Sequence, residues 1–234
     1  GGLWVDYELQ TSIPGLYAIG EANFSDHGAN RLGANSLLQA CVDGYFILPN
    51  TIGSYLSKEI HSGKISTDSP EFEEAENLVT ERIQKILEVK GNLSANHFHK
   101  RLGKLMWDNV GLERSKESLE KAIRELKLLR ADFWNHINVP GTDQGINSEL
   151  EKAERVADYI ELASVMAYDA LKRNESCGAH FRSEYQTADG EAMRNDDEFQ
   201  YVSVWQFNGV GIEPILHKEP LEFEELKPSI RSYK

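Results

Sequence analysis

The residue types that suit chemistry are concentrated between positions 21 and 37, near the N-terminus. Glu21 offers a carboxylate that can accept hydrogen bonds from hydroxyl groups. Arg31 offers a guanidinium fork, which pairs well with a carboxylate. Asn35-Ser36-Leu37 opens an apolar stretch, and a helix beginning there presents free backbone N–H groups and a positive dipole end to an anion. These residues predict a site for an anionic ligand.

The segment before Glu21 must place that carboxylate. Residues 1–7 resemble a strand and a turn, and Pro14-Gly15 is a turn signal. Residues 16–19 then form a short apolar run without a polar face, which is typical of a strand buried on both sides in an α/β core. Ligands bind at the carboxyl ends of such strands, so Glu21 is expected at a ligand-binding edge.

The segment after Arg31 predicts a helix that runs from residue 36 to residue 48. We expect Asn35 or Ser36 to cap it and Pro49 to end it. A second short helix is expected over residues 51–61.

Each of these side chains also has an ordinary structural interpretation. An isolated arginine such as Arg31 is more often part of a surface ion pair than of a binding site. Glu21 alone is an unremarkable acid at a strand end. His27 alone is more often a hydrogen-bonded loop residue than a catalytic one.

From residue 66 onward the pattern is strongly helical. Ser69-Pro70 indicates a helix start, and Ser148-Glu-Leu-Glu151 has the sequence of a capping box. Apolar residues recur at helical spacing, as in Phe72, Ala75, Val79, Ile83, Ile86 and Leu87, and again in Leu119, Ala122, Ile123, Leu126, Leu129 and Phe133. This pattern predicts an antiparallel bundle of three to four helices between about residues 70 and 174.

The expected fold class is mainly α, with a partial α/β segment at the N-terminus and an extended tail with short strands. One such strand is expected within residues 198–207, where polar and apolar residues alternate. The predicted domains are residues 1–62, a helical bundle at 66–174 and an irregular tail at 175–234.

Composition narrows the classes of function. The 234 residues are 40% hydrophobic and 27% charged, which is typical of a globular protein. The net charge of -13, without a basic patch, excludes nucleic acid as a partner. Cys41 and Cys177 form no paired motif, which indicates a reducing compartment and predicts no metal site. The sequence has no signal peptide, and no apolar run approaches the roughly 18 residues that a membrane span requires.

Three segments resemble one family. Gly15-Leu-Tyr-Ala-Ile-Gly-Glu21, followed by His27-Gly-Ala-Asn-Arg-Leu-Gly-Ala-Asn-Ser-Leu37, closely resembles the flavoprotein subunit of succinate dehydrogenase and fumarate reductase. Arg173-Asn-Glu-Ser-Cys-Gly-Ala-His-Phe-Arg182 is similar to that family's Arg-x-Glu-Ser-Arg-Gly-Ala-His-x-Arg segment, with Cys177 in place of the usual arginine. Lys227-Pro-Ser-Ile-Arg-Ser-Tyr233 is similar to the family's C-terminus. The resemblance extends over essentially the whole chain.

The resemblance implies roles for the N-terminal residues. Glu21 would contact FAD, and Ser36 and Leu37 would contact the flavin ring through their backbone groups. Asn35, which precedes them, belongs with these cofactor-binding residues.

The substrate side is implied in the same way. Arg31 would bind a carboxylate of succinate or fumarate. His27 would support it, either by orienting Arg31 or by lining the pocket. Near the C-terminus, His180 and Arg182 would either pack the tail on the bundle or help to form a subunit contact.

Several parts of the family's machinery are absent from this sequence. These are the Gly-x-Gly-x-x-Gly fingerprint for FAD, the histidine that carries the flavin covalently and the arginine that transfers the proton. No catalytic residue is therefore assigned. The chain begins Gly1-Gly2-Leu3-Trp4 without a methionine, and we interpret it as the C-terminal part of a longer protein. Alone, it is expected to be inactive and not to retain FAD.

The resemblance also implies a setting for the parent protein. It would interconvert succinate and fumarate with FAD, in the tricarboxylic acid cycle and electron transport. Electrons would pass to an iron–sulfur subunit and then to quinone at a membrane-anchor cytochrome subunit. The parent would be a peripheral subunit on the cytoplasmic face of the inner membrane, whereas the fragment alone would be soluble.

Two alternatives remain open. L-aspartate oxidase is a relative with a similar His-Gly-Ala-Asn-Arg-Leu motif, although Ala179–Arg182 and Ile230–Tyr233 favour the dehydrogenase or reductase. The chain is also consistent with a helical module that docks partner subunits and has no activity of its own.

Overall fold

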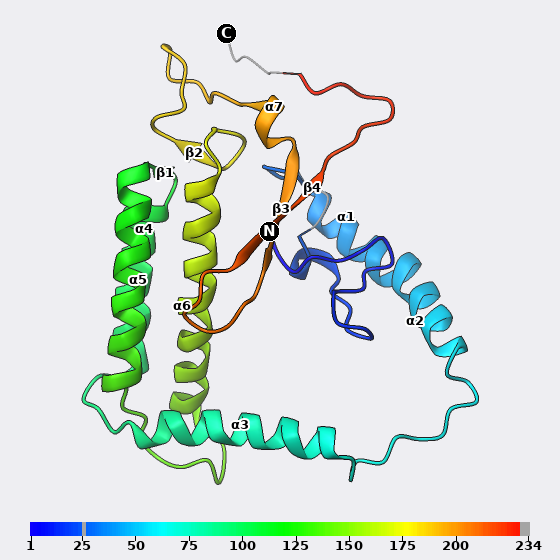
Figure 1. The fold of residues 1–234 in the computed structure, drawn as a ribbon, viewed down its shortest axis with the longest axis vertical. Coiled ribbons are helices and arrows are strands. Elements are labelled where there is room, and N and C mark those ends of the chain that lie inside the picture. The colour runs from blue at the N-terminus through cyan, green and yellow to red at the C-terminus, as the bar shows by residue number, and fades with distance from the viewer. Residues whose placement is uncertain (25–26, 230–234) are drawn as a thin grey trace. The chain divides into compact units, whose positions relative to one another are not determined.

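The computed structural model describes residues 1–24 and 27–229. It forms two compact units, the first over residues 1–66 and the second from residue 67 onward. Helices dominate the chain (Figure 1), which confirms the expectation of a mainly α protein. The three-part division at residues 62, 66 and 174 stays a prediction.

Unit 1 combines irregular segments with one long helical stretch. Its elements are η1 (Gly20–Ala22), α1 (Asn35–Val42), the π-helical turn η2 (Asp43–Ile47) and α2 (Leu48–Ser57). The last three follow one another without a break, as the light-blue ribbon of Figure 1 shows.

Pro49 does not end this helix, contrary to the prediction. It lies in the first turn of α2, directly after the π-helical turn. Proline is tolerated in the first turn of a helix, where its missing N–H would have no partner within α2, and the preceding π turn has already changed the hydrogen-bond pattern. The side-chain amide of Asn50 donates to the carbonyl of Phe46 over 2.7 Å and satisfies one acceptor there. The helix therefore continues to Ser57.

The strands predicted at residues 1–7 and 16–19 are wrong for this structure. The described part of unit 1 has only isolated bridges, which join Leu3 to Asn23 and Gln10 to Tyr17. A strand needs a hydrogen-bonded neighbour along its length, and residues 16–19 form a single bridge at Tyr17. Its two hydrogen bonds run from the Thr11 N–H to the Leu16 carbonyl and from the Ala18 N–H to the Leu9 carbonyl. Leu16 consequently remains 46% exposed.

Unit 2 contains the larger helices and all the named strands of the described residues. The helices are α3 (Pro70–Glu88), α4 (Ala95–Val110), α5 (Lys116–His136), α6 (Ser148–Lys172) and α7 (Asp196–Phe199). The strands are β1 (Glu113–Arg114), β2 (Phe181–Arg182), β3 (Tyr201–Gln206) and β4 (Ile215–Pro220).

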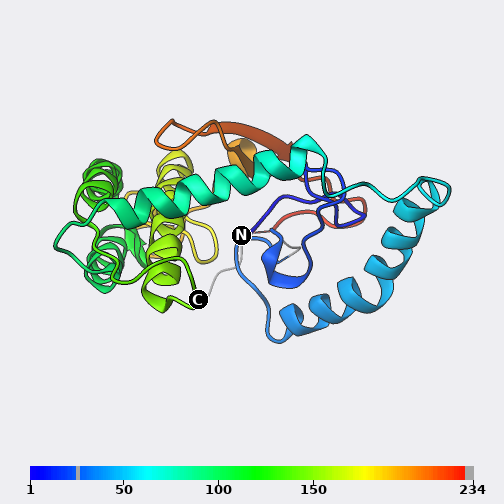
Figure 2. The same cartoon turned by 90° about the horizontal axis from the view of Figure 1, so that it is seen from below.

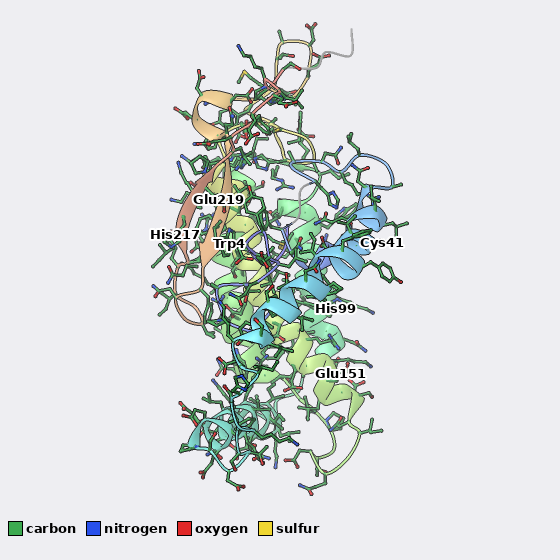
Figure 3. All side chains as sticks on the ribbon, turned by 90° about the vertical axis from the view of Figure 1, so that its right-hand side faces the viewer. Trp4, Cys41, His99, Glu151, His217 and Glu219 are labelled. Atoms are coloured by element: carbon green, nitrogen blue, oxygen red, sulfur yellow. The ribbon has the colours of Figure 1, made fainter. Side chains whose placement is uncertain are left out.

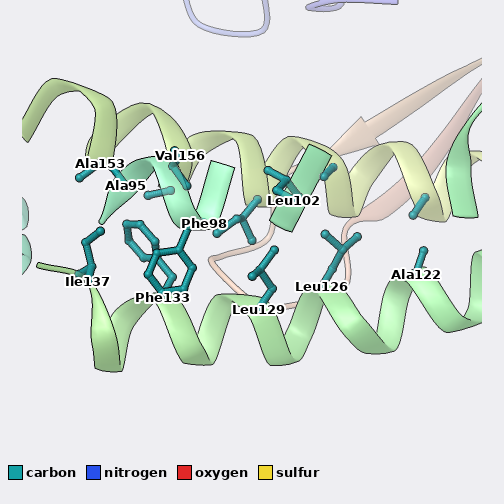
Figure 4. Close-up of a cluster of buried hydrophobic side chains, with 14 of the residues drawn as sticks. Ala95, Phe98, Leu102, Ala122, Leu126, Leu129, Phe133, Ile137, Ala153 and Val156 are labelled. Atoms are coloured by element: carbon teal, nitrogen blue, oxygen red, sulfur yellow. The ribbon is translucent and has the colours of Figure 1, made fainter. Parts of the chain in front are cut away.

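The core of unit 2 lies between α4, α5 and α6, which all pack against one another (Figure 4). The rings of Phe98 and Phe133 meet edge to face, with centroids 5.3 Å apart. Small residues on α6, such as Ala153 and Ala167, are fully buried and let the helices approach closely.

Helix α3 lies across one end of these three helices (Figures 1 and 2). Only its C-terminal part reaches the core, where Ile86 is fully buried. Phe72 and Val79 belong to the same predicted apolar face but are 49% and 58% exposed. The apolar pattern of α3 is thus only partly used within this chain.

The strands form two small sheets. β1 and β2 pair in parallel, with Glu113 opposite Phe181. β3 and β4 form an antiparallel hairpin, of which only β3 was expected from the sequence. His217 and Glu219 lie on β4 (Figure 3), and Nε2 of His217 is 2.8 Å from Oε1 of Gln206 on β3.

The helix ends correct one predicted cap and add another. Asn147 caps α6 by accepting a hydrogen bond from the Leu150 N–H over 3.1 Å, so the predicted capping box at Ser148–Glu151 begins one residue late. Helix α5 has a true capping box between Ser115 and Ser118. Within the described residues, no helix is both long and apolar enough to span a membrane.

Replacing Phe133 with alanine tests the core. Phe133 is fully buried against Phe98 and Trp134, so the Phe133→Ala variant should lower the free energy of unfolding by about 3–5 kcal/mol. Urea denaturation followed by circular dichroism measures this value. The control is Leu128→Ala on the same helix, where the side chain is 64% exposed and the change should stay within about 0.5 kcal/mol. Equal losses in both variants would contradict the described packing.

Candidate functional site

Three of the predicted site residues meet where α1 begins. Nη1 of Arg31 lies 3.8 Å from Oε1 of Glu21 and donates a short hydrogen bond to the hydroxyl of Ser36. Ser36 is buried, whereas the side chains of Arg31 and Glu21 are 49% and 66% exposed. An exposed ion pair of this kind is weak, so the guanidinium remains open to another carboxylate.

The first turn of α1 presents unpaired backbone donors. Among the described residues, the N–H groups of Ser36 and Leu37 have no hydrogen-bond acceptor, and the Leu37 side chain is 73% exposed. Asn35 is the first helical residue and is also exposed. This end of the helix can therefore accept a negatively charged group.

The predicted cap at Asn35 or Ser36 is wrong. Ala34 is the N-cap residue, has a left-handed backbone with φ of 65°, and makes no side-chain cap. The Ser36 hydroxyl is engaged by Arg31 and accepts no hydrogen bond from a backbone group of its own helix.

His27 precedes this cluster in the sequence and is half-buried. Its Nε2 atom is buried and has no hydrogen-bond partner within residues 1–24 and 27–229. No hydrogen bond joins it to Arg31 in that part of the chain. A buried polar atom without a partner costs about 1–3 kcal/mol, which makes His27 a candidate ligand contact.

A buried carboxylate that the sequence analysis missed holds the loop before the site. Asp43 is 3% exposed, and its Oδ2 accepts hydrogen bonds from the Gly20 N–H at 2.8 Å and from Nδ2 of Asn23 at 3.4 Å. Asn23 also donates to the Ala18 carbonyl at 3.1 Å. Asp43 thereby ties the residue next to Glu21 to the helix that starts with the Ser36 turn. A single acid within the apolar run 36–48 was the available signal.

Gly20 is needed at this junction. Its φ is 59°, and a side chain there would place a Cβ atom 3.3 Å from Cβ of Ala40. Only glycine combines the left-handed backbone with this close approach to α1.

The segment from Arg173 to Arg182 serves packing in unit 2. Arg182 is 1% exposed, and its guanidinium donates to the carbonyls of Ala170 and Leu171 at 3.0 and 3.3 Å. It therefore satisfies carbonyl groups at the end of α6 that the helix leaves free. Buried in this way, Arg182 is not available for the subunit contact that the sequence left open.

Arg173 joins the tail to the end of α6. It donates to Oε1 of Glu175 at 2.9 Å and to the Tyr201 carbonyl at 2.9 Å, and it lies over the Tyr201 ring. Glu175 is 3% exposed and accepts a hydrogen bond from the Asn195 N–H at 3.0 Å. Cys177 is half-buried, and burial raises the pKa of its thiol.

His180 completes this cluster. Its Nε2 lies 2.9 Å from the Arg173 carbonyl and its Nδ1 lies 3.4 Å from Nη1 of Arg114. Burial lowers the pKa of His180, and Arg114 and Arg182 lower it further.

The final motif residues Ile230–Tyr233 lie outside the described residues. The described residues contain no group of three or more His, Cys, Asp or Glu that could hold a metal ion.

Comparison with known families identifies the class as flavoproteins with a helical C-terminal domain. The model of the fumarate reductase flavoprotein C-terminal family matches residues 99–233, and an FAD-binding domain model matches residues 1–37. The chain therefore belongs to the fumarate reductase flavoprotein family.

Individual relatives support the same assignment. The chain is 33% identical to the succinate dehydrogenase flavoprotein subunit of Bacillus subtilis over 100% of its own length and 38% of the relative's. It is 30% identical to a Helicobacter pylori fumarate reductase flavoprotein subunit, again over its full length and 32% of the relative's. It thus spans about a third of the length of these curated relatives.

Solved structures extend the comparison to the fold. An E. coli quinol fumarate reductase matches 98% of this chain and 37% of its own, with a TM-score of 0.82 and 26% identity. Among the curated sequences, L-aspartate oxidase of Synechocystis is 28% identical over 78% of this chain and 32% of its own length.

His180 gives unit 2 a pH dependence with a defined sign. Because the folded-state pKa lies below the ordinary value of 6.5, the unfolded chain binds the proton more readily. The contribution of neutral His180 to stability is complete above pH 6.5 and is lost as the pH falls from 6.5 through the folded-state pKa. The His180→Asn variant should lose less stability over this interval than the original chain, as measured by urea denaturation at a series of pH values.

The matched control is His217→Asn, because His217 is exposed on β4. Its pH profile should follow that of the original chain. If His180→Asn also reproduced the original profile, burial of a neutral His180 would be refuted.

Proposed function

We propose that this chain is the C-terminal part of a flavoprotein subunit that interconverts succinate and fumarate with FAD. The observation that carries the proposal is the meeting of Glu21, Arg31 and Ser36 at the start of α1. These residues lie within the segment that matches the FAD-binding domain model. A guanidinium can hold a carboxylate of the substrate, while a carboxylate acceptor and free N–H groups can hold the flavin cofactor beside it.

Arg31 is the proposed binding group for a substrate carboxylate. Its contact with Glu21 is long, at 3.8 Å, and exposed, so exchange of that contact for a bidentate carboxylate is favourable. Its hydrogen bond to buried Ser36 fixes the position of the guanidinium. His27, with its unpartnered Nε2, is the proposed second polar group of the same pocket.

The residues present fit the proposed cofactor. The N–H groups of Ser36 and Leu37, together with exposed Asn35, can hold the electron-rich edge of the flavin ring. Glu21 can accept hydrogen bonds from hydroxyl groups of FAD. When bound, FAD supplies the acceptor for a hydride from the substrate carbon.

The described chain supplies one side of this proposed site, and no residue in it is assigned as the catalytic acid. We therefore expect the chain alone to hold FAD weakly and to be inactive. In the whole protein, electrons would leave to an iron–sulfur subunit and reach quinone at a membrane-anchor subunit, with the flavoprotein peripheral on the cytoplasmic face of the inner membrane.

L-aspartate oxidase is the second candidate, because a relative of that name shares 28% identity with this chain. The third candidate is a subunit-docking role for the helices alone. The exposed apolar residues on α3, such as Phe72 and Val79, favour some contact beyond this chain.

A chimeric enzyme tests the proposal. This chain would replace the matching C-terminal region of the Bacillus subtilis succinate dehydrogenase flavoprotein subunit, with which it aligns over its full length. The chimera should incorporate FAD and oxidise succinate. The Arg31→Gln variant should then lower kcat/KM for succinate by roughly 10–200-fold, because a charge-assisted hydrogen bond contributes about 1.5–3 kcal/mol.

The matched control is Arg124→Gln, which removes an exposed arginine of α5 and should leave kcat/KM unchanged. FAD content, read from the flavin absorbance, shows that each variant is folded. A folded chimera that oxidises aspartate and not succinate would favour the second candidate. Full succinate activity in Arg31→Gln would refute the proposed role of Arg31.

A further inference from the structure

Unit 2 has a pocket that the proposed function does not use. It lies between α5, α6 and the connection from β3 to β4, and its volume is about 160 Å³. Its walls include the aromatic rings of Tyr168, Trp205 and Phe207 and the aliphatic side chains of Leu162 and Ile212. A cavity of about 150 Å³ is large enough to bind benzene, so this pocket has room for one six-membered ring.

Three polar residues that line the pocket are joined by hydrogen bonds. Arg130 donates to both carboxylate oxygens of Glu161, at 2.5 and 2.7 Å, and to the Ser164 hydroxyl at 3.2 Å. The side chains of Arg130 and Glu161 are only 15% and 30% exposed. This bidentate pair fixes the guanidinium and cancels its charge.

Lys127 adds a charge that is not cancelled. It lines the same pocket one helical turn before Arg130, and no carboxylate pairs with it among the described residues. Positions three and four residues away on its own helix are Ile123, Arg124, Arg130 and Ala131, so α5 offers it no acid either. The pocket therefore carries a net positive charge in a chain whose net charge is -13.

The walls of the pocket are held in place. The indole N–H of Trp205 donates to Oδ1 of Asp169 at 2.9 Å, which fixes one ring. On the opposite side, Gly209 has a φ of 118°, and a Cβ atom there would lie 2.9 Å from Cδ1 of Ile212. Glycine at this position lets the connection fold back over the pocket.

From these observations we infer that the pocket binds a small aromatic carboxylate. The ring lies between the aromatic and aliphatic walls, and the carboxylate faces Lys127. A ligand without a ring-sized body would bury too little apolar surface against these walls to bind well, and the uncancelled lysine favours an anion over a neutral molecule of the same shape. This inference does not depend on the proposed function, because every residue that it uses belongs to unit 2.

Calorimetric titration of the 234-residue chain with benzoate tests the inference. Saturable binding is expected with a Kd on the order of 0.1–1 mM, as suits a ligand of this size. Benzyl alcohol, which keeps the ring without the charge, and acetate, which keeps the charge without the ring, should each bind at least about tenfold more weakly. Absence of saturable benzoate binding, or equal affinity for either comparison compound, would overturn the inference.

Two variants locate the binding. Lys127→Met removes the charge from an exposed side chain and should weaken benzoate binding about tenfold, whereas Lys121→Met on the same helix should not. Leu162→Trp fills the pocket from a residue that is 57% exposed and should abolish binding without unfolding the chain, as circular dichroism would verify. Unchanged binding in Lys127→Met would refute the role of the lysine, and unchanged binding in a folded Leu162→Trp would place benzoate elsewhere.

Discussion

The buried carboxylate of Asp43 is the interaction on which the N-terminal site depends. It accepts hydrogen bonds from the Gly20 N–H and from the Asn23 side chain, and it does so from the π-helical turn that follows α1. A buried charge is tolerated only when such donors surround it. Because Gly20 is bound in this way, Glu21 is held near the start of α1, where Arg31 contacts Ser36. The proposed cofactor and substrate contacts thus share one support.

Unit 2 also contains a buried charged side chain that hydrogen-bonds backbone groups, but there the side chain is a cation. Arg182 is buried at the C-terminal end of α6, where it donates to carbonyl groups that the helix cannot satisfy itself. Arg173 and Glu175 then connect that end to the tail. The motif that resembles the family at Arg173–Arg182 therefore stabilises the architecture of unit 2, whereas the motif at His27–Leu37 carries the proposed ligand contacts.

Much of this could be predicted where local pattern and packing agree. The apolar spacing of Leu119, Leu126 and Phe133 predicted α5 because one face of that helix is buried within the chain. The strand at residues 16–19 was not formed, because pairing depends on neighbours that local sequence cannot supply. Pro49 misled the helix prediction because a π-helical turn precedes it, and the local sequence does not indicate that turn. Residue type and resemblance predicted that Glu21, Arg31 and Ser36 belong to one site, which stays a prediction. They did not predict the supporting contact of Asp43, since a lone acid in a helix gives no sign of its partners.

The hydrogen bond from the Gly20 N–H to Asp43 fixes the loop that carries Glu21. Hydrogen exchange of the Gly20 amide in the 234-residue chain tests it most directly, with Asp43→Ala compared with the original sequence and with Glu59→Ala, which changes an exposed acid of the same unit. Asp43→Ala should speed exchange of the Gly20 amide by roughly tenfold or more, because its acceptor is lost, while Glu59→Ala should leave it unchanged. An unchanged exchange rate in a folded Asp43→Ala variant would show that Asp43 does not hold this loop.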